Sequence, residues 1–242
     1  MKSISTFVRQ KIDKLPSGKV FNYSFFSERK GNSLAFAKSL SRMAKDGQIA
    51  RLSRGNYYKP VKSVFGELIP NENQVILALT QKKGETVGYV SGLTAYNALG
   101  LTSQVSNTLI IARRSVQPDK VLNGYNIRYI KRDFSFTRED VKLLQILDAC
   151  KDIKTIPGVS SSDALKILVA SVMKLKNSEI RRLIRLAFNY PPSVRALVGA
   201  VIEGSNPEVS IISLFKSLNP LSRYKIGIDQ SVLCNKSKWN IE

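Results

Sequence analysis

The sequence predicts an α+β protein in three parts. These are a winged helix-turn-helix over residues 1–60, a small α+β domain over 61–134 and a mainly helical part over 135–242. Three observations lead to this prediction. Apolar residues at helical spacing precede a short hairpin in the first part, strand-like runs alternate with short helices in the second, and capped amphipathic stretches follow one another in the third. Since 43% of the residues are hydrophobic, the chain can build a core.

In the first part, the spacing of apolar residues and the turn residues predict three helices and a β-hairpin. Val8, Ile12 and Leu15 have the spacing of one helix face, and a second short helix follows Asn22. The third helix, residues 33–45, has an apolar stripe that includes residues 36, 40 and 43, and Gly47 suits its left-handed end. Two short strands, 49–52 and 57–59, flank a turn at 53–56. This order of elements is typical of a winged helix.

The charge is unusually positive and unevenly distributed. The chain has 38 Lys and Arg against 18 Asp and Glu, a formal net charge of +20. Residues 1–60 alone contain 13 Lys and Arg against 3 Asp and Glu. Such an excess favours an anionic partner and places its surface at the N-terminal end of the chain.

We therefore predict a DNA-binding surface on the third helix and the hairpin. An α-helix fits the major groove, and basic side chains on a neighbouring hairpin can neutralise phosphates. The predicted DNA-binding residues are Ser33, Lys38, Ser39, Arg42, Lys45, Arg51, Arg54, Tyr57 and Lys59. Two alternatives stay open at this point: a helix face that is charged only because it is solvated, and a protein-interaction module.

The middle part predicts short helices around a small sheet. A helix is expected over 72–80, strands over 87–90 and 108–112, the latter in a central position, and a hairpin turn at Asn123-Gly124-Tyr125. Ser91 is expected to cap a short helix over 93–99. The pair Arg113 and Arg114 follows the central strand, where it extends the DNA footprint, meets an acidic partner or is solvated.

The third part predicts successive helices near residues 137–147, 164–175, 179–188, 193–202 and 209–218. Arg181, Arg182 and Arg185 are neighbours on one helix surface. They are candidate partner-binding residues, for an acidic protein or for flanking DNA phosphate, with a solvated surface as the alternative. The tail from residue 222 to 242 is expected to be a hairpin or partly disordered.

Several classes of function are disfavoured. The chain has no histidine, which excludes Ser-His-Asp catalysis and histidine-ligated metals. Its two cysteines, Cys150 and Cys234, are expected to be free thiols, and Glu67, Glu72 and Glu85 are too scattered to predict a metal site. We expect no enzyme activity, no cofactor and no metal. Without a signal peptide or an apolar run of about 20 residues, a cytoplasmic protein is expected.

Four segments resemble the abortive-infection antitoxins of the AbiEi type. They are Leu40-Ser41-Arg42-Met43-Ala44-Lys45-Asp46-Gly47-Gln48-Ile49, Arg54-Gly55-Asn56-Tyr57-Tyr58-Lys59-Pro60, residues 91–105 and residues 191–203. Each segment is short, and their order along residues 5–205 gives the resemblance its specificity.

The resemblance implies two roles. One is a transcriptional regulator that binds duplex DNA at its own operator, and the other is an antitoxin of a toxin–antitoxin system that neutralises a nucleotidyltransferase toxin. Two alternatives remain: a nucleic-acid-processing enzyme that carries a winged helix for targeting, and a stand-alone regulator without a toxin. Neither membrane binding nor an oligomeric state is predicted.

Overall fold

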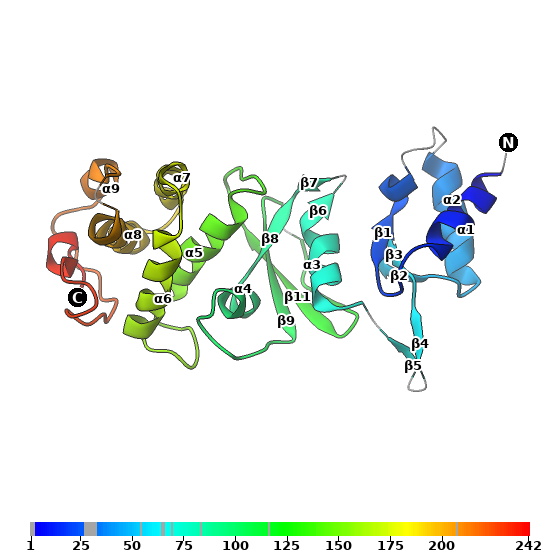
Figure 1. Cartoon of the computed structure of the whole chain (residues 1–242), viewed down its shortest axis with the longest axis horizontal. Helices are drawn as coiled ribbons and strands as arrows, with labels where there is room; N and C mark the ends of the chain where they lie inside the picture. The colour runs from blue at the N-terminus through cyan, green and yellow to red at the C-terminus, as the bar shows by residue number, and fades with distance from the viewer. Residues whose placement is uncertain are drawn as a thin grey trace. The chain divides into compact units, whose positions relative to one another are not determined.

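The chain divides into two compact units in the computed structural model, which describes residues 3–26, 33–53, 55–63, 66–68, 70–82, 84–115, 117–206 and 208–242. Unit 1 comprises Met1–Gly88 and Gln117–Arg128, and unit 2 comprises Tyr89–Val116 and Tyr129–Glu242. Helices and strands both contribute, which confirms the predicted α+β class (Figure 1). The predicted boundaries after residues 60 and 134 lie inside unit 1 and unit 2 respectively.

Unit 1 begins with helices and a three-stranded sheet. The elements follow in the order α1 (Ile4–Asp13), β1 (Val20–Asn22), the 3-10 helix η1 (Tyr23–Phe26), α2 (Ser33–Lys45), β2 (Ala50–Ser53) and β3 (Asn56–Tyr58). The strands are antiparallel in the order β1-β3-β2, so β1 adds to the outer side of the β2–β3 hairpin. The helices and hairpin thus lie where the apolar pattern and turn residues predict them.

A compact aromatic and aliphatic core holds these elements together. Val8 and Ile12 of α1 pack with Leu40 of α2, and Phe21 and Phe26 complete the cluster between helices and sheet. The end of α2 is closed by Gly47 at φ 68°, and the Gln48 amide donates to the Met43 carbonyl at 3.0 Å. This confirms the predicted left-handed helix end.

After β3, unit 1 continues with a helix and two short strand pairs. It contains β4 (Val61–Ser63) paired with β5 (Gly66–Leu68), α3 (Glu72–Thr80), and β6 (Gln81–Lys82) paired with β7 (Glu85–Thr86). Asn71 caps α3 by accepting from the Gln74 amide at 3.0 Å. Gln74 in turn accepts from the Val20 amide at 3.1 Å, which attaches α3 to the edge strand β1.

A four-stranded sheet has the order β10-β11-β9-β8. Its strands are β8 (Gly88–Ser91), β9 (Thr108–Arg113), β10 (Lys120–Leu122) and β11 (Tyr125–Lys131). As predicted, β9 is an inner strand, and β10 and β11 form a hairpin. Its turn residues Asn123 and Gly124 both have positive φ, 47° and 79°, as expected for the two-residue turn that matches the twist of a hairpin.

The helices of unit 2 surround a central one, α8 (Pro192–Ser205). It contacts α5 (Val141–Asp152), α6 (Ser161–Met173), α7 (Asn177–Ala187), α9 (Ile212–Lys216) and the 3-10 helix η2 (Lys236–Trp239) (Figure 1). Because partners cover it on most sides, nearly all of its residues from Val194 to Ile202 are buried and apolar. α4 (Leu93–Ala98) shares the same core. None of the described helices combines the length and apolar character that crossing a membrane requires.

The C-terminal tail packs against α8. Trp239 is fully buried, and its indole Nε1 donates to the Glu203 carboxylate of α8 at 2.9 Å. The same carboxylate accepts from Asn235 at 2.9 Å and is paired with Lys238. The expectation of a hairpin or a partly disordered tail is wrong in both forms, because the tail consists of turns and η2. It packs on α8, where it supplies three donors to the Glu203 carboxylate.

The Trp239 ring fits only because α8 has a glycine beneath it. A Cβ at Gly199 would lie 2.2 Å from the Trp239 ring, whereas a Cβ at Gly204 would meet no atom within 4 Å. We expect Gly199→Ala to lower the free energy of unfolding by about 1–3 kcal/mol through overpacking. The matched change Gly204→Ala in the same helix should raise it by up to about 1 kcal/mol. Urea denaturation measures both, and equal effects would contradict this account of Trp239.

Candidate nucleic-acid interface

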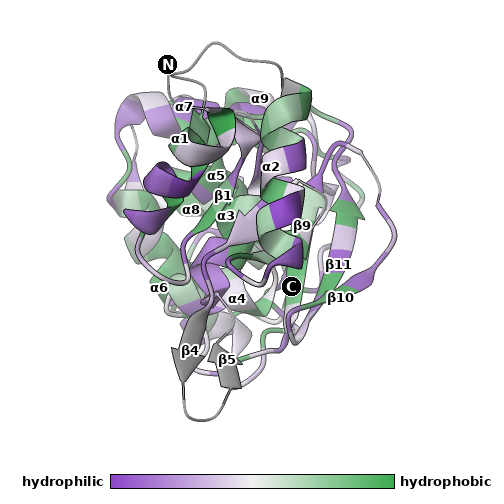
Figure 2. Cartoon of the chain, turned by 90° about the vertical axis from the view of Figure 1, so that its right-hand side faces the viewer, coloured by the Kyte–Doolittle hydropathy of each residue, from purple (hydrophilic) through white to green (hydrophobic). Residues whose placement is uncertain are grey.

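Three cations form an exposed stripe along α2. Lys38, Arg42 and Lys45 occupy positions i, i+4 and i+7, which share one face of a helix, and all three side chains are exposed. The opposite face packs into the core through residues such as Leu40, which is 1% exposed. In Figure 2, hydrophilic and hydrophobic residues alternate along α2. We call residues 38, 42 and 45 the α2 stripe.

Among the described residues, the β2–β3 hairpin of unit 1 has one exposed cation besides those of the α2 stripe. Arg51 is exposed on β2, where its Nε lies 3.4 Å from the Ser53 carbonyl oxygen. The hairpin turn is fixed by Gly55 at φ 82° and by a 2.9 Å hydrogen bond between the Asn56 amide and the Ser53 hydroxyl. Arg54 lies outside the described residues, as does the side chain of Ser33.

Three predicted DNA-binding residues have structural positions instead. Tyr57 is 8% exposed, and its ring stacks on Phe21 with 6.4 Å between centroids, so it belongs to the core. Lys59 donates to the Asp13 carbonyl at 2.9 Å, which satisfies the C-terminal end of α1. The Ser39 hydroxyl is buried on the inner side of α2. A single sequence cannot show the contacts of Tyr57 and Lys59, because their partners, Phe21 and Asp13, are distant along the chain.

The predicted partner-binding arginines of unit 2 also divide into two groups. Arg114, Arg181 and Arg185 are exposed. Arg113 ends β9 half-buried, and Arg182 makes a two-point ion pair with Asp140, with both N···O distances 2.7 Å. The pKa of the Asp140 carboxyl lies below its usual value, chiefly because Arg182 donates hydrogen bonds to it. Arg182 therefore joins α7 to the start of α5.

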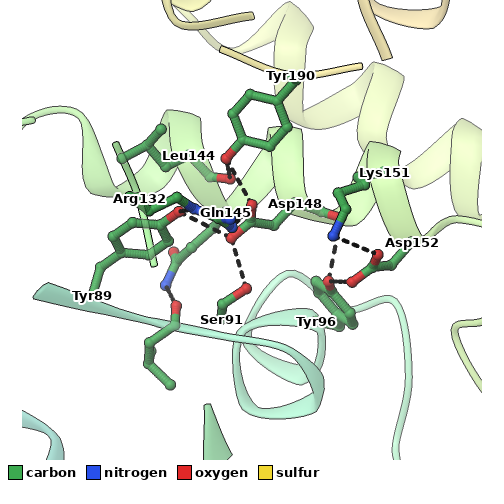
Figure 3. A network of polar contacts seen from close by, with 11 residues as sticks. Tyr89, Ser91, Tyr96, Arg132, Leu144, Gln145, Asp148, Lys151, Asp152 and Tyr190 are labelled. Atoms are coloured by element: carbon green, nitrogen blue, oxygen red, sulfur yellow. Dashed lines mark hydrogen bonds and ion pairs between the residues drawn. The ribbon is translucent and has the colours of Figure 1, made fainter. Parts of the chain in front are cut away.

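A buried polar cluster in unit 2 was missed by the sequence analysis. Asp148 of α5 is 1% exposed, and its Oδ1 accepts from Arg132 at 2.5 Å and from the Tyr190 hydroxyl at 2.6 Å. Its Oδ2 accepts from the Ser91 hydroxyl at 2.6 Å and from the Tyr89 hydroxyl at 3.1 Å. Figure 3 shows these side chains converging on the one carboxylate. The available signal was a lone aspartate inside the apolar run from residue 143 to 150.

Ser91 is one of the residues that the structure reassigns. It does not cap α4: Gly92 occupies the N-cap position and provides no side-chain hydrogen bond. The Ser91 hydroxyl instead donates to Asp148 at 2.6 Å.

The environment of Asp148 favours a structural role for the cluster. Burial raises the pKa of Tyr89 to about 12, and burial together with the Asp148 charge raises that of Tyr190. Both hydroxyls thus stay protonated near neutral pH and donate. Burial opposes the charge of Arg132, but Asp148 beside it raises the pKa of the guanidinium above its ordinary value. With four protein donors on one carboxylate, no further group is needed to satisfy it.

The described residues offer no metal centre. Among them, no group of three or more His, Cys, Asp or Glu side chains is arranged to hold an ion. The side chain of Glu67 lies outside the described residues. Cys150 is buried and Cys234 is exposed, and both are free thiols, as predicted.

Comparison with known families shows one match. A family described as a family of unknown function (DUF6088) matches residues 7–156, more than half of the chain. The protein belongs to the DUF6088 family. The matched region of this DUF6088 protein includes all of α2, the β2–β3 hairpin and Asp148, but stops short of α7.

Comparisons with individual proteins add little to this assignment. No curated protein matches this DUF6088 chain. Among solved structures, the crystal structure of the RV2827C protein from Mycobacterium tuberculosis is similar at 13% identity and a TM-score of 0.46, covering 91% of this chain and 83% of that one.

Removal of the Asp148 carboxylate tests the role of the cluster. We expect Asp148→Ala to lower the free energy of unfolding by about 3–5 kcal/mol, because it leaves Arg132 buried without a counter-charge. Denaturation in urea, followed by circular dichroism, measures the change. Asp133→Ala is the control, since Asp133 forms an exposed pair with Lys131 and should leave the midpoint nearly unchanged. A stability loss no larger than that of the control would refute the structural role.

Proposed function

We propose that this protein is a DNA-binding transcriptional regulator whose N-terminal elements form a winged helix. The α2 stripe carries this proposal: three cations project from one face of a helix that is fixed from behind by an apolar core. The order α1-β1-η1-α2-β2-β3, with β1 paired to the hairpin, is the arrangement expected of such a domain.

In this proposal the helix and the hairpin have different tasks. The α2 stripe enters the major groove, where Lys and Arg side chains donate to guanine acceptors. Arg51 on the hairpin lies over the backbone and neutralises a phosphate, which adds affinity without reading sequence. Tyr57 and Lys59 act indirectly, because they support the sheet and the end of α1.

Salt dependence and substitution test this division of tasks. If Arg51 and other basic side chains of unit 1 neutralise about four phosphates, affinity for duplex DNA should fall about a hundredfold between about 50 and 200 mM salt. Arg42→Ala should weaken binding by about 1–3 kcal/mol and reduce discrimination between sites, whereas Arg51→Ala should weaken all sequences alike. Fluorescence anisotropy with labelled duplexes measures both effects.

A matched control uses a cation remote in sequence from this surface. Lys225→Ala in unit 2 removes the same charge from an exposed position and should change DNA affinity far less than Arg42→Ala. Affinity that is flat across this salt range, or equal losses for all three variants, would sink the proposed interface.

The resemblance to AbiEi-type antitoxins extends the proposal to a second role. The regulator would then also neutralise a nucleotidyltransferase toxin and repress the operon that encodes both, without being an enzyme itself. This part rests on the resemblance alone. The expected outcome is that co-expression with the neighbouring gene product relieves growth arrest caused by that product, and a neighbouring product without toxicity would remove this role while leaving DNA binding intact.

A further inference from the structure

A second exposed basic stripe lies on α7 of unit 2. Arg181, Arg185 and Phe188 occupy positions i, i+4 and i+7, with Phe188 at the C-terminal cap, so they share one face. All three are exposed, and 44% of the surface of Phe188 is accessible. None of the ion pairs recorded between described residues involves Arg181 or Arg185. We call these three residues the α7 surface.

The α7 surface is held on a rigid element. The opposite face of α7 is buried in the core of unit 2 through residues such as Ile180 and Leu183, both 0% exposed. At its start, the Glu179 carboxylate accepts from the Lys176 amide at 2.8 Å. The Arg182–Asp140 pair fixes the helix laterally. A partner would therefore order only the exposed side chains, which keeps the entropic cost of binding low.

The neighbouring surface is also positive. Because Arg182 contacts Asp140, the start of α5 lies beside α7, and Arg138 and Lys142 are exposed on either side of that aspartate. Glu139 is the one carboxylate in this stretch that is exposed. Asp140 and Arg182 neutralise each other, which leaves an excess of positive charge around the α7 surface.

We propose that the α7 surface binds an acidic segment of a partner protein. Arginine guanidinium groups match carboxylates in a two-point geometry, so Arg181 and Arg185 suit acidic side chains one helical turn apart. Phe188 then packs against an apolar side chain of the same segment. Arginine and aromatic residues together are typical of protein–protein interfaces.

The aromatic residue favours a protein over nucleic acid as the partner. The α2 stripe has Lys45 at the position that corresponds to Phe188, so all three of its positions can contact a phosphate or a base edge. The phosphates of a DNA duplex offer no apolar group to Phe188, and its bases are stacked on one another. This proposal goes beyond the DNA-binding function, because it concerns another unit and another class of partner.

Peptide binding to the full-length chain tests the proposal. The probe is a labelled helical peptide with two glutamates one turn apart and a leucine one turn further on the same face, and its matched form has glutamine for glutamate. We expect the glutamate peptide to bind at least about tenfold more tightly. The double change Arg181→Glu with Arg185→Glu should remove that difference. Phe188→Ser should weaken both peptides by about tenfold, because both carry the leucine.

A second double variant controls for net charge. Lys216→Glu with Lys225→Glu makes the same change in charge at exposed positions elsewhere in unit 2, and it should leave peptide affinity within about twofold. Unfolding midpoints should be unchanged in both double variants, since their altered side chains are exposed. Phe188→Ser is compared well below its own midpoint, because only 44% of the Phe188 surface is accessible. Binding by neither peptide, equal binding of both, or equal losses in the two double variants would overturn the proposal.

Nucleic acid is the remaining outcome. If the Arg181→Glu, Arg185→Glu double variant loses affinity for duplex DNA but keeps its affinity for the glutamate peptide, the partner is not a protein and the proposal fails. DNA affinity through the α2 stripe is read separately from Arg42→Ala, so failure here and failure of the proposed regulator function are distinguishable.

Discussion

The buried carboxylate of Asp148 is the interaction on which unit 2 depends. Its two oxygens collect donors from the sheet, from the chain after β11 and from the loop before α8, through Ser91, Arg132 and Tyr190. A charge with this little exposure is stable only while all its donors are in place. The cluster therefore fixes how the helices lie against the sheet, and with them the α7 surface.

The two exposed stripes share one geometry and differ in chemistry. Each has side chains at i, i+4 and i+7 on a helix whose other face is buried, so each presents them without a large loss of conformational entropy. Lys38, Arg42 and Lys45 are all cations, which suits a polyanion. On α7 a half-exposed Phe188 accompanies Arg181, which suits an acidic protein segment. Part of the high net charge thus lies on two exposed helix faces.

Prediction from sequence succeeded where the signal is local. The periodicity of α2, the left-handed Gly47 and the Asn123-Gly124 turn each depend on a few neighbouring residues, and each is found as expected. Prediction from sequence failed for Tyr57 and Arg182. A sequence does not show whether a tyrosine is exposed or packed in the core, or whether an arginine is exposed or held in an ion pair. Their partners lie 36 and 42 positions away along the chain, at Phe21 and Asp140.

The sequence by itself therefore determined the α+β class, the helical stripes and the concentration of positive charge near the N-terminus. Only the tertiary structure decided which charges remain free, because pairing depends on distances between elements far apart in the chain. It also explained Trp239, whose ring needs the missing side chain of Gly199 and the carboxylate of Glu203 on α8. Such fits follow from packing, which no local pattern encodes.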